Sequence, residues 1–392
     1  MIGERRLVAC ALTLAALCLP RLLLAQETVG DVVGFLVTNQ AVVTADFEKD
    51  LAAAEAARAT ISRALLVDLT SVPLATASSG FLYRLNPQLG TVERATESFG
   101  GFFVERALTA GRGRASFGVS ATSLDFDRLD GRSLTDGTLV TVANRFRDES
   151  AAFDTESLTL HISSSTMTLF GSVGLTDRIE IGAAVPLVRL TLDGQRVNVY
   201  RGTTFLQASG TASASGVADI ALRAKVTALA ARQGGIAIAG EVRLPTGDEA
   251  NLLGTGSTSI RVMGIGSLER GPFALHGNAA IVRGGISSEL DFGGAASLAV
   301  HPRVTISGEV LTRRVSDLHS MDLISAPHPT ITGVDTLRLA EGVDATMLAN
   351  AVAGLKWNVT RTVVIGGHLS WALTNTGLTA PVTPTLAFEY AF

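Results

Sequence analysis

The chain has 392 residues, of which 47% are hydrophobic and 17% are charged, and its formal net charge is −4. This mild acidity, without a block of basic residues, argues against nucleic-acid binding. Both cysteines, Cys10 and Cys18, lie in a segment that we predict to be removed, so we expect no disulfide framework. After residue 25, no run of about 18 apolar residues predicts a membrane-spanning helix.

Residues 1–25 have the pattern of a secretory signal peptide. Arg5 and Arg6 form a basic start, an apolar run follows from Leu7 to Leu19, and a candidate cleavage point follows Ala25. We therefore expect export with a cleaved signal peptide, although the pattern does not fix the cleavage site.

Residues 26–79 predict a helical segment. Apolar residues recur at helical spacing from about Asp46 to Leu66, and charged residues occupy the rest of the helical wheel. Thr44 or Asp46 is suited to cap its start. Such an amphipathic helix needs an apolar partner, and we expect this partner to be the sheet structure predicted for the remainder of the chain.

Residues 80–112 mix strand and turn signals. Residues 80–84 alternate, Asn86-Pro87 and Leu89-Gly90 supply turns, and F-G-G-F-F at 99–103 is a cluster of aromatic residues. Two interpretations stay open: a hairpin that lies inside the structure formed by the following strands, or two further strands of its sheet.

From residue 113 to 392, one face of each predicted strand is apolar and the other is polar or small. The alternation is clearest at 117–122, 179–187, 219–227, 236–244, 273–278, 304–310 and 363–371. An apolar composition without a spanning helix fits alternating strands in a closed barrel, which satisfies its backbone groups in lipid.

The connections between these strands alternate in length. Short ones lie at 175–178, 231–234, 269–271, 301–303 and 359–361, and long ones lie at 128–154, 193–213, 245–254, 316–341 and 375–381. Short periplasmic turns and long outer loops are typical of outer-membrane barrels. The count is about twelve strands, or fourteen if residues 80–112 join the wall, and both chain ends lie in the periplasm.

The last strand has a distinct pattern. Leu386, Phe388, Tyr390 and Phe392 share one face, and Ala387, Glu389 and Ala391 share the other. A final strand that ends on an aromatic residue resembles the C-terminal signature of bacterial outer-membrane barrels, which implies recognition by the barrel-assembly machinery. The chain is only 5% aromatic, so we expect thin aromatic girdles at the membrane interfaces.

Together these patterns predict an all-β fold: a transmembrane antiparallel up-and-down β-barrel with an N-terminal amphipathic helix. The predicted organisation is a signal peptide (1–25), a helical plug or periplasmic segment (26–79), a hairpin in the lumen or first wall strands (80–112), and the barrel (113–392). The predicted location is the outer membrane of a Gram-negative bacterium, with lipid as a partner. The helix is either a gate or a seal, and the oligomeric state is not indicated.

Three stretches resemble one known family. They are F-F-V-E-R-A-L-T-A-G-R-G-R (102–114), G-L-T-D-R-I-E-I-G-A-A-V-P-L (174–187), and L-P-T-G-D (244–248) with the L-L-G-T-G that follows (252–256). They are similar to the outer-membrane channel family named for the MetA pathway of phenol degradation, and the resemblance covers roughly residues 99–392. It implies a β-barrel that passes small apolar or aromatic molecules passively. The N-terminal helix falls outside it.

Charged residues on the polar faces are candidates for the lumen lining, because a buried charge must be paired or hydrated. They are Glu180, Asp219, Arg223, Lys225, Glu241, Arg243, Glu309, His368 and Glu389. We expect the three cations on neighbouring strands, Arg223, Lys225 and Arg243, to be neutralised mainly by Asp219 and Glu241. Bracing of a closed interior is then favoured over a wet pore.

A catalytic site is not indicated. His161 precedes hydroxyl residues at 163–166, and it shares a strand face with Ser163 and Ser165 unless a bulge intervenes. The apolar phase shifts nearby, which suggests such a bulge or the outer end of the strand. No third group is placed to orient a base, so we expect no enzyme and no catalytic residue. The six histidines have no metal-ligand spacing, and no cofactor is expected.

The function that this sequence favours is a passive channel for a small-molecule solute, apolar or aromatic according to the resemblance. A non-conducting structural or adhesion barrel, whose outer loops bind partners, is the alternative from another class. An outer-membrane hydrolase is a third. The sequence does not indicate which solute would pass.

Overall fold

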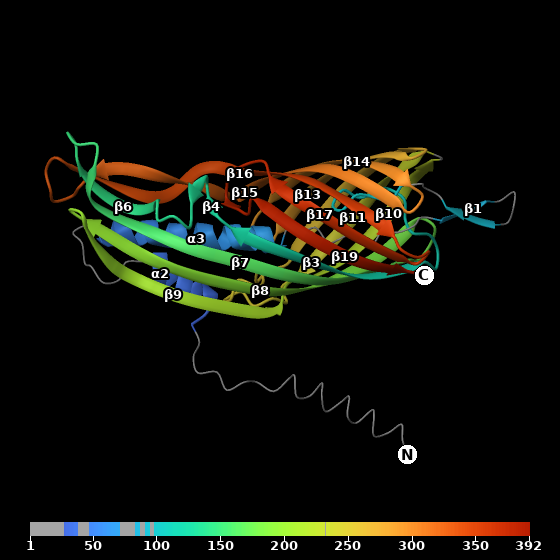
Figure 1. The fold of residues 1–392 in the computed structure, drawn as a ribbon, viewed down its shortest axis with the longest axis horizontal. Helices are drawn as coiled ribbons and strands as arrows, with labels where there is room; N and C mark the ends of the chain where they lie inside the picture. Colours follow the sequence, from blue (N-terminus) through green and yellow to red (C-terminus); the bar gives the residue numbers. More distant parts are fainter. Residues whose placement is uncertain (1–26, 38–46, 71–82, 87–90, 95–97, 232) are drawn as a thin grey trace, which may run out of the picture.

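The computed structural model describes residues 27–37, 47–70, 83–86, 91–94, 98–231 and 233–392. Twelve antiparallel strands close into a barrel, which confirms the predicted all-β barrel with an N-terminal helix (Figure 1). In order around the ring, the wall strands are β3 (Ala115–Phe126), β7 (Ala152–Gly174), β8 (Ile179–Tyr200), β10 (Ile220–Ala231), β11 (Gly234–Leu244), β12 (Ser259–Arg270), β13 (Phe273–Gly284), β14 (Glu289–His301), β15 (Val304–Pro327), β16 (Val334–Asn358), β17 (Val363–Ala372) and β19 (Val382–Ala391).

The remaining elements supplement this wall. They are α2 (Val29–Val37), α3 (Phe47–Thr70), β1 (Tyr83–Asn86), β2 (Thr91–Arg94), β4 (Arg128–Leu129), β5 (Arg132–Ser133), β6 (Leu139–Phe146), β9 (Thr203–Val217) and β18 (Leu378–Thr379). Strands β1 and β2 pair with each other in a separate sheet, so the wall has twelve strands and not fourteen.

Four wall strands are about twice as long as a membrane requires. Strands β7, β8, β15 and β16 have 23, 22, 24 and 25 residues, whereas a tilted transmembrane strand needs about 9–11. Strand β6 pairs with both β7 and β16, and β9 pairs with β8. The outer parts of these six strands therefore form an extension beyond the barrel, at the left of Figure 1.

This extension corrects the predicted loops. Residues 193–213 belong almost entirely to β8 and β9, residues 316–341 largely to β15 and β16, and residues 128–154 contain β4, β5 and β6. Outside the lipid, a strand does not need an outward apolar face, so these stretches lack the alternation that marks a membrane strand.

The apolar face of a long strand changes sides along its length. In β7, Met167 is 44% exposed on the outer surface, whereas Leu158 and Leu160 are 1% and 0% exposed and face inward. The pairing of β7 with β8 runs from residue 154 to 174 without a register shift, so the bulge suggested near His161 is wrong. The phase changes because the barrel part of the strand has its apolar side outward, and the extension has it inward.

The inward apolar faces of the extension pack around the two helices. Helix α2 contacts β8 and β9, and α3 contacts β15 and β16 (Figure 1). Gly194 permits the close approach of α2, since a Cβ atom there would lie 2.7 Å from Leu36 Cδ1. Arg196 Nη1 donates to the Leu36 carbonyl at 3.0 Å, and Arg338 Nε donates to Asp50 Oδ1 at 2.5 Å. Each helix is thus held by apolar packing and by one wall arginine.

The helix boundaries differ from the sequence prediction. Helix α3 extends to Thr70, four residues beyond the predicted end, because its last turn remains buried in the same core. Helix α2 is not predicted at all, since nine residues give too few turns for a periodic signal. Its capping box was the available signal: Asp31 N donates to Thr28 Oγ1 at 3.1 Å and Thr28 N donates to Asp31 Oδ2 at 3.2 Å.

We predict that Leu36→Ala loosens α2 while the barrel stays folded. Leu36 is fully buried in the core of the extension, so its truncation should cost about 2–5 kcal/mol of docking free energy. Limited proteolysis should cut within residues 27–37 much faster in this variant. Phe35→Ala is the matched control, because Phe35 is 47% exposed and its removal should have little effect. Equal protection in Leu36→Ala and the native chain would contradict the assigned packing.

Candidate functional site

The interior of the barrel holds a chain segment, residues 98–112, which we call the internal segment. At one end, Phe99 N donates to Thr305 Oγ1 of β15 at 3.1 Å. At the other end, Ala110 N donates to Glu180 Oε2 of β8 at 2.9 Å. Strands β8 and β15 are separated by half of the ring in the strand order. The internal segment therefore crosses the lumen from one wall to the opposite one.

Glu309 of β15 holds the aromatic part of the internal segment. Its carboxylate accepts hydrogen bonds from the backbone N–H groups of Phe102, Phe103 (3.0 Å) and Val104 (2.8 Å), and its side chain is almost fully buried. Three successive backbone N–H donors stabilise the buried carboxylate, as they would stabilise an anion bound in a concave turn of the backbone. A Cβ atom on Gly101 would lie 2.8 Å from Glu309 Oε1, so the glycine allows this approach.

Lys356 of β16 binds the same part of the segment through its carbonyl groups. Its Nζ atom donates to the carbonyl oxygens of Gly100 (2.8 Å) and Gly101, and it lies 4.7 Å from the centroid of the Phe102 ring. The ring of His368, on β17, lies 4.5 Å from that of Phe102. A buried ammonium is thus compensated by carbonyl dipoles and by an aromatic face.

A second group of charges holds the far end of the internal segment. Lys225 Nζ donates to the Leu108 carbonyl at 3.2 Å and lies 3.7 Å from Glu180 Oε1. Arg223 forms an ion pair with Glu105 of the segment. Wall charges on β8 and β10 are therefore compensated partly by each other, in the pair Lys225–Glu180, and partly by the inserted backbone and Glu105.

A third group of charges forms a ladder on one side of the wall. It consists of the pairs Arg243–Glu241 (2.8 Å), Arg261–Asp291 (2.9 Å) and Arg313–Glu289 (2.8 Å) on strands β11, β12, β14 and β15. The first pair lies within β11, the second reaches across β13, and only the third joins the neighbouring strands β14 and β15. Each pair compensates the loss of hydration of its two charges.

The nine predicted lumen residues fall into these groups with one exception, Asp219. Glu309 and His368 lie at the aromatic end of the internal segment, and Glu389 lies close enough to Lys356 there for their charges to interact. Glu180, Arg223 and Lys225 lie at its far end, and Glu241 and Arg243 lie in the ladder. Glu389 is buried on β19 opposite Gly118 of β3.

Asp219 has a different partner from the one expected. It lies between β9 and β10, and its carboxylate accepts hydrogen bonds from Gly247 N at 3.0 Å and from Thr255 N and Oγ1 at 2.9 and 2.7 Å. Asp219 thus fixes the outer loop between β11 and β12. Of the three cations on this part of the wall, only Arg243 pairs with Glu241, and Arg223 pairs with the internal segment.

Sequence reasoning missed several charged residues of the interior, among them Glu105, Arg106, Arg261, Glu289, Asp291, Arg313 and Lys356. Glu289 and Asp291 alternate with Leu290 and Phe292, which are 39% and 51% exposed, so the period of two could have revealed them. No such signal exists for Glu105, because it lies in an irregular segment.

The face predicted to carry the insertion signature lies on the outside of the last strand. Leu386, Phe388, Tyr390 and Phe392 are 70%, 43%, 42% and 61% exposed. Strand β19 lies between β17 and β3, and the backbone of Phe392 pairs with that of Ala115. The aromatic end of the chain therefore closes the ring with its apolar side outward.

The residues considered for catalysis do not form a nucleophile and a base. His161 is exposed on the outer surface, and no hydrogen bond joins it to the neighbouring serines within the described strands. Ser163 Oγ instead shares a hydrogen bond of 2.6 Å with Thr191 Oγ1. Across the described ranges, no group of three or more His, Cys, Asp or Glu side chains is placed to hold a metal ion. No helix in those ranges is long and apolar enough to cross a membrane.

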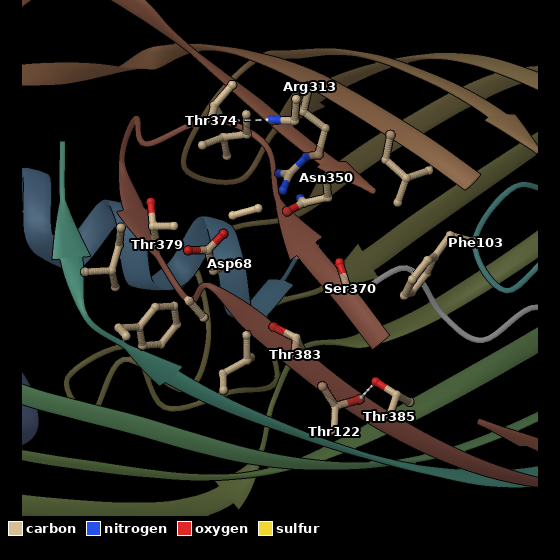
Figure 2. Close-up of a pocket in the computed structure, with 18 of the residues that line it drawn as sticks. Asp68, Phe103, Thr122, Arg313, Asn350, Ser370, Thr374, Thr379, Thr383 and Thr385 are labelled. Carbon is tan, nitrogen blue, oxygen red and sulfur yellow. Dashed lines mark hydrogen bonds between the residues drawn. The ribbon is translucent and has the colours of Figure 1, made fainter. Parts of the chain in front are cut away.

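A cavity of about 140 Å³ lies between the end of α3 and the internal segment. Asp68 of α3 and Phe103 of the internal segment lie on opposite sides of it, and Asn350 and Arg313 lie near Asp68 (Figure 2). Burial raises the pKa of Asp68 from 3.8 to about 7, and the positive charge of Arg313 opposes this shift only in part. The two inserts therefore border a small space whose lining includes Asp68, Arg313 and His368.

Comparison with known proteins shows likeness of fold at low identity. No family model and no curated protein match the chain. An outer-membrane channel from Pseudomonas putida F1 aligns with 73% of this chain and 98% of its own, with 13% identity and a TM-score of 0.46. The porin NanC aligns with 70% and 98%, with 5% identity and a TM-score of 0.35. The Ralstonia pickettii toluene transporter TbuX aligns with 72% and 90%, with 12% identity and a TM-score of 0.28.

We predict that Glu309→Ala releases the internal segment locally. Loss of the carboxylate leaves three buried N–H groups without an acceptor, and a hydrogen bond to a charged group contributes roughly 1.5–3 kcal/mol. Amide hydrogen exchange at residues 102–104 should become about 10- to 100-fold faster. Val310→Ala is the matched control, because Val310 is the next residue on the strand and is 50% exposed outside. Unchanged amide exchange at residues 102–104 in Glu309→Ala would contradict the role assigned to the Glu309 carboxylate.

Proposed function

We propose that this protein is an outer-membrane channel through which small solutes pass passively, and that residues 27–70 are its plug. The observation that carries the proposal is the filling of the lumen by two inserts of different kinds. A barrel of twelve strands is wider than the eight-stranded kind that side chains alone can fill. Two helices occupy the outer part of this interior, and the internal segment crosses the inner part.

The outer surface supports the membrane location. Strands β10 to β14, β17 and β19 have 10–13 residues, the length of a membrane crossing. Their outward residues are apolar, as Leu222 and Val226 of β10 illustrate at 47% and 45% exposure. The predicted signal peptide and the aromatic end of β19 support export and insertion by the barrel-assembly machinery.

The solutes that we propose are small and at least partly apolar. The cavity of about 140 Å³ is comparable with the 150 Å³ engineered cavity that binds benzene, and aromatic and aliphatic side chains form part of its lining. A path for large hydrophilic solutes is not supported, because paired charges and the inserted backbone occupy the inner part of the lumen.

The pairing of most interior charges also favours a second candidate, a non-conducting structural barrel. In that case the helices and the internal segment simply replace water in the lumen. Removal of the plug distinguishes the two functions, because only a channel should then conduct.

We predict that deletion of residues 26–79 opens the barrel. In planar bilayers, the shortened protein should give larger and more frequent conductance steps than the mature chain, because the outer part of the lumen loses its filling. A matched deletion of β1 and β2 should leave conductance unchanged, since these strands pack mainly on each other. Silence of the shortened protein, with its folding shown by heat-modifiable migration on a gel, would favour the structural barrel.

We also predict that the plug is released more readily at higher pH. Because burial raises the pKa of Asp68 to about 7, its folded form prefers the protonated carboxyl. The docking stability from this preference is fully present below pH 3.8 and is lost as the pH rises through about 7. Opening events should therefore increase between pH 5 and 8. Asp68→Asn should abolish this dependence, and an unchanged pH profile in that variant would exclude Asp68 as its source.

A further inference from the structure

The lining of the cavity between α3 and the internal segment combines hydroxyl groups with apolar side chains. The hydroxyl groups of the wall include Thr122 on β3, Ser370 on β17, and Thr383 and Thr385 on β19 (Figure 2). Thr122 Oγ1 and Thr385 Oγ1 are 3.0 Å apart and share one hydrogen bond, so each retains capacity for a further partner. These hydroxyl groups can both donate hydrogen bonds to a ligand and accept them.

The apolar side chains of the lining are Phe103 of the internal segment and Leu124, Phe126, Leu311 and Leu348 of the wall. The volume of about 140 Å³ suits a molecule with one six-membered ring. A ligand that fills the cavity would thus bury a hydrocarbon ring against these side chains and place a polar substituent at the wall hydroxyls.

The charges at the Asp68 end determine which polar substituent fits. Arg313 is engaged by Glu289 at 2.8 Å and by Asp291 at 3.9 Å, so its charge is already compensated. Asp68 adds a carboxyl group beside it, and Asn350 adds a neutral amide. A carboxylate ligand would therefore meet one acidic side chain and a neutralised cation, whereas a hydroxyl group would find donors and acceptors.

We propose that this cavity is a binding site for small neutral alcohols, with one six-membered ring and a single hydroxyl group. The ring is held by burial against the apolar side chains, and its hydroxyl group forms hydrogen bonds with the wall hydroxyls. A hydrocarbon of the same size binds less well, because it displaces water from these hydroxyls and returns no hydrogen bond. A carboxylate of the same skeleton is rejected. The inference rests on the proposed channel function in that the site would lie on the solute path.

Titration calorimetry on the full mature chain in detergent tests the site directly. Cyclohexanol should bind saturably with one site per chain, and cyclohexanecarboxylate at pH 7.5 should bind at least tenfold more weakly. Binding of both with equal affinity would overturn the assignment of a neutral alcohol. Absence of saturable cyclohexanol binding to the folded native chain would overturn the site itself.

Two variants on β17 distinguish binding of cyclohexanol in the cavity from its partition into detergent or lipid. Ser370→Phe fills the cavity and should weaken cyclohexanol binding at least tenfold, whereas Leu369→Phe, on the lipid side and 41% exposed in the native chain, should change it less than twofold. Equal effects of the two variants would place the binding elsewhere. If Ser370→Phe does not fold, the milder double variant Ser370→Ala/Thr383→Val serves, with an expected three- to tenfold loss; an unchanged affinity would refute recognition by the hydroxyls.

The proposed channel and the proposed binding site can be contradicted independently of each other. Conduction by the protein without residues 26–79, together with absence of cyclohexanol binding to the full chain, would overturn the site and leave the channel. Cavity-specific binding, together with silence of the shortened protein, would support the site and overturn the channel.

Discussion

The structure depends on one constraint: a wall strand turns alternate side chains to the inside and the outside, and each side must match its surroundings along the whole strand. In β8 the inward residue Glu180 binds the internal segment, whereas Leu190 and Leu192, on the same inward face, pack in the core around the helices. The pairing is continuous between them. The contents of the lumen therefore change from polar to apolar along the barrel axis, and the sequence changes with them.

This change explains why two inserts of different composition are present. The apolar part of the interior needs an apolar partner, and helices α2 and α3 supply it with the stripe of Val32, Leu36, Ile61 and Leu65. The polar part needs donors and acceptors, and an irregular backbone supplies them, because its N–H and C=O groups are not used within a helix or sheet. Glu309 and Lys356 take three N–H groups and two carbonyl groups from neighbouring residues.

The barrel itself could be predicted because lipid imposes its pattern on the sequence. Strands of 10–13 residues with outward apolar side chains, such as β10 and β13, gave an alternation that limited the wall to twelve or fourteen strands. The separate pairing of β1 with β2 decides for twelve. The extension could not be predicted in the same way. Residues 193–213 and 316–341 have no lipid outside them, so their polar composition resembled that of loops although they are strands.

Of the residues that form the candidate site, only those on the wall strands could be predicted from the sequence. Glu180, Lys225 and Glu309 stood out because they interrupt apolar strands, but their partners did not. Glu105 and the N–H groups of Phe102 to Val104 belong to an irregular segment with no periodic signal. Pairing between neighbouring wall strands was the natural expectation for such charges. The structure instead directs several of them to a chain that crosses the lumen, which is a long-range contact that no local pattern records.

The two inserts also differ in how they are attached to the wall. The internal segment continues into β3 within a few residues, since Ala115 is already paired with Phe392 in the wall. Helices α2 and α3 are held to the wall by apolar packing and by the contacts of Arg196 and Arg338. Non-covalent contacts of this kind can be exchanged for water, whereas a continuous backbone cannot. This difference supports the proposal that the helices, rather than the internal segment, form the plug.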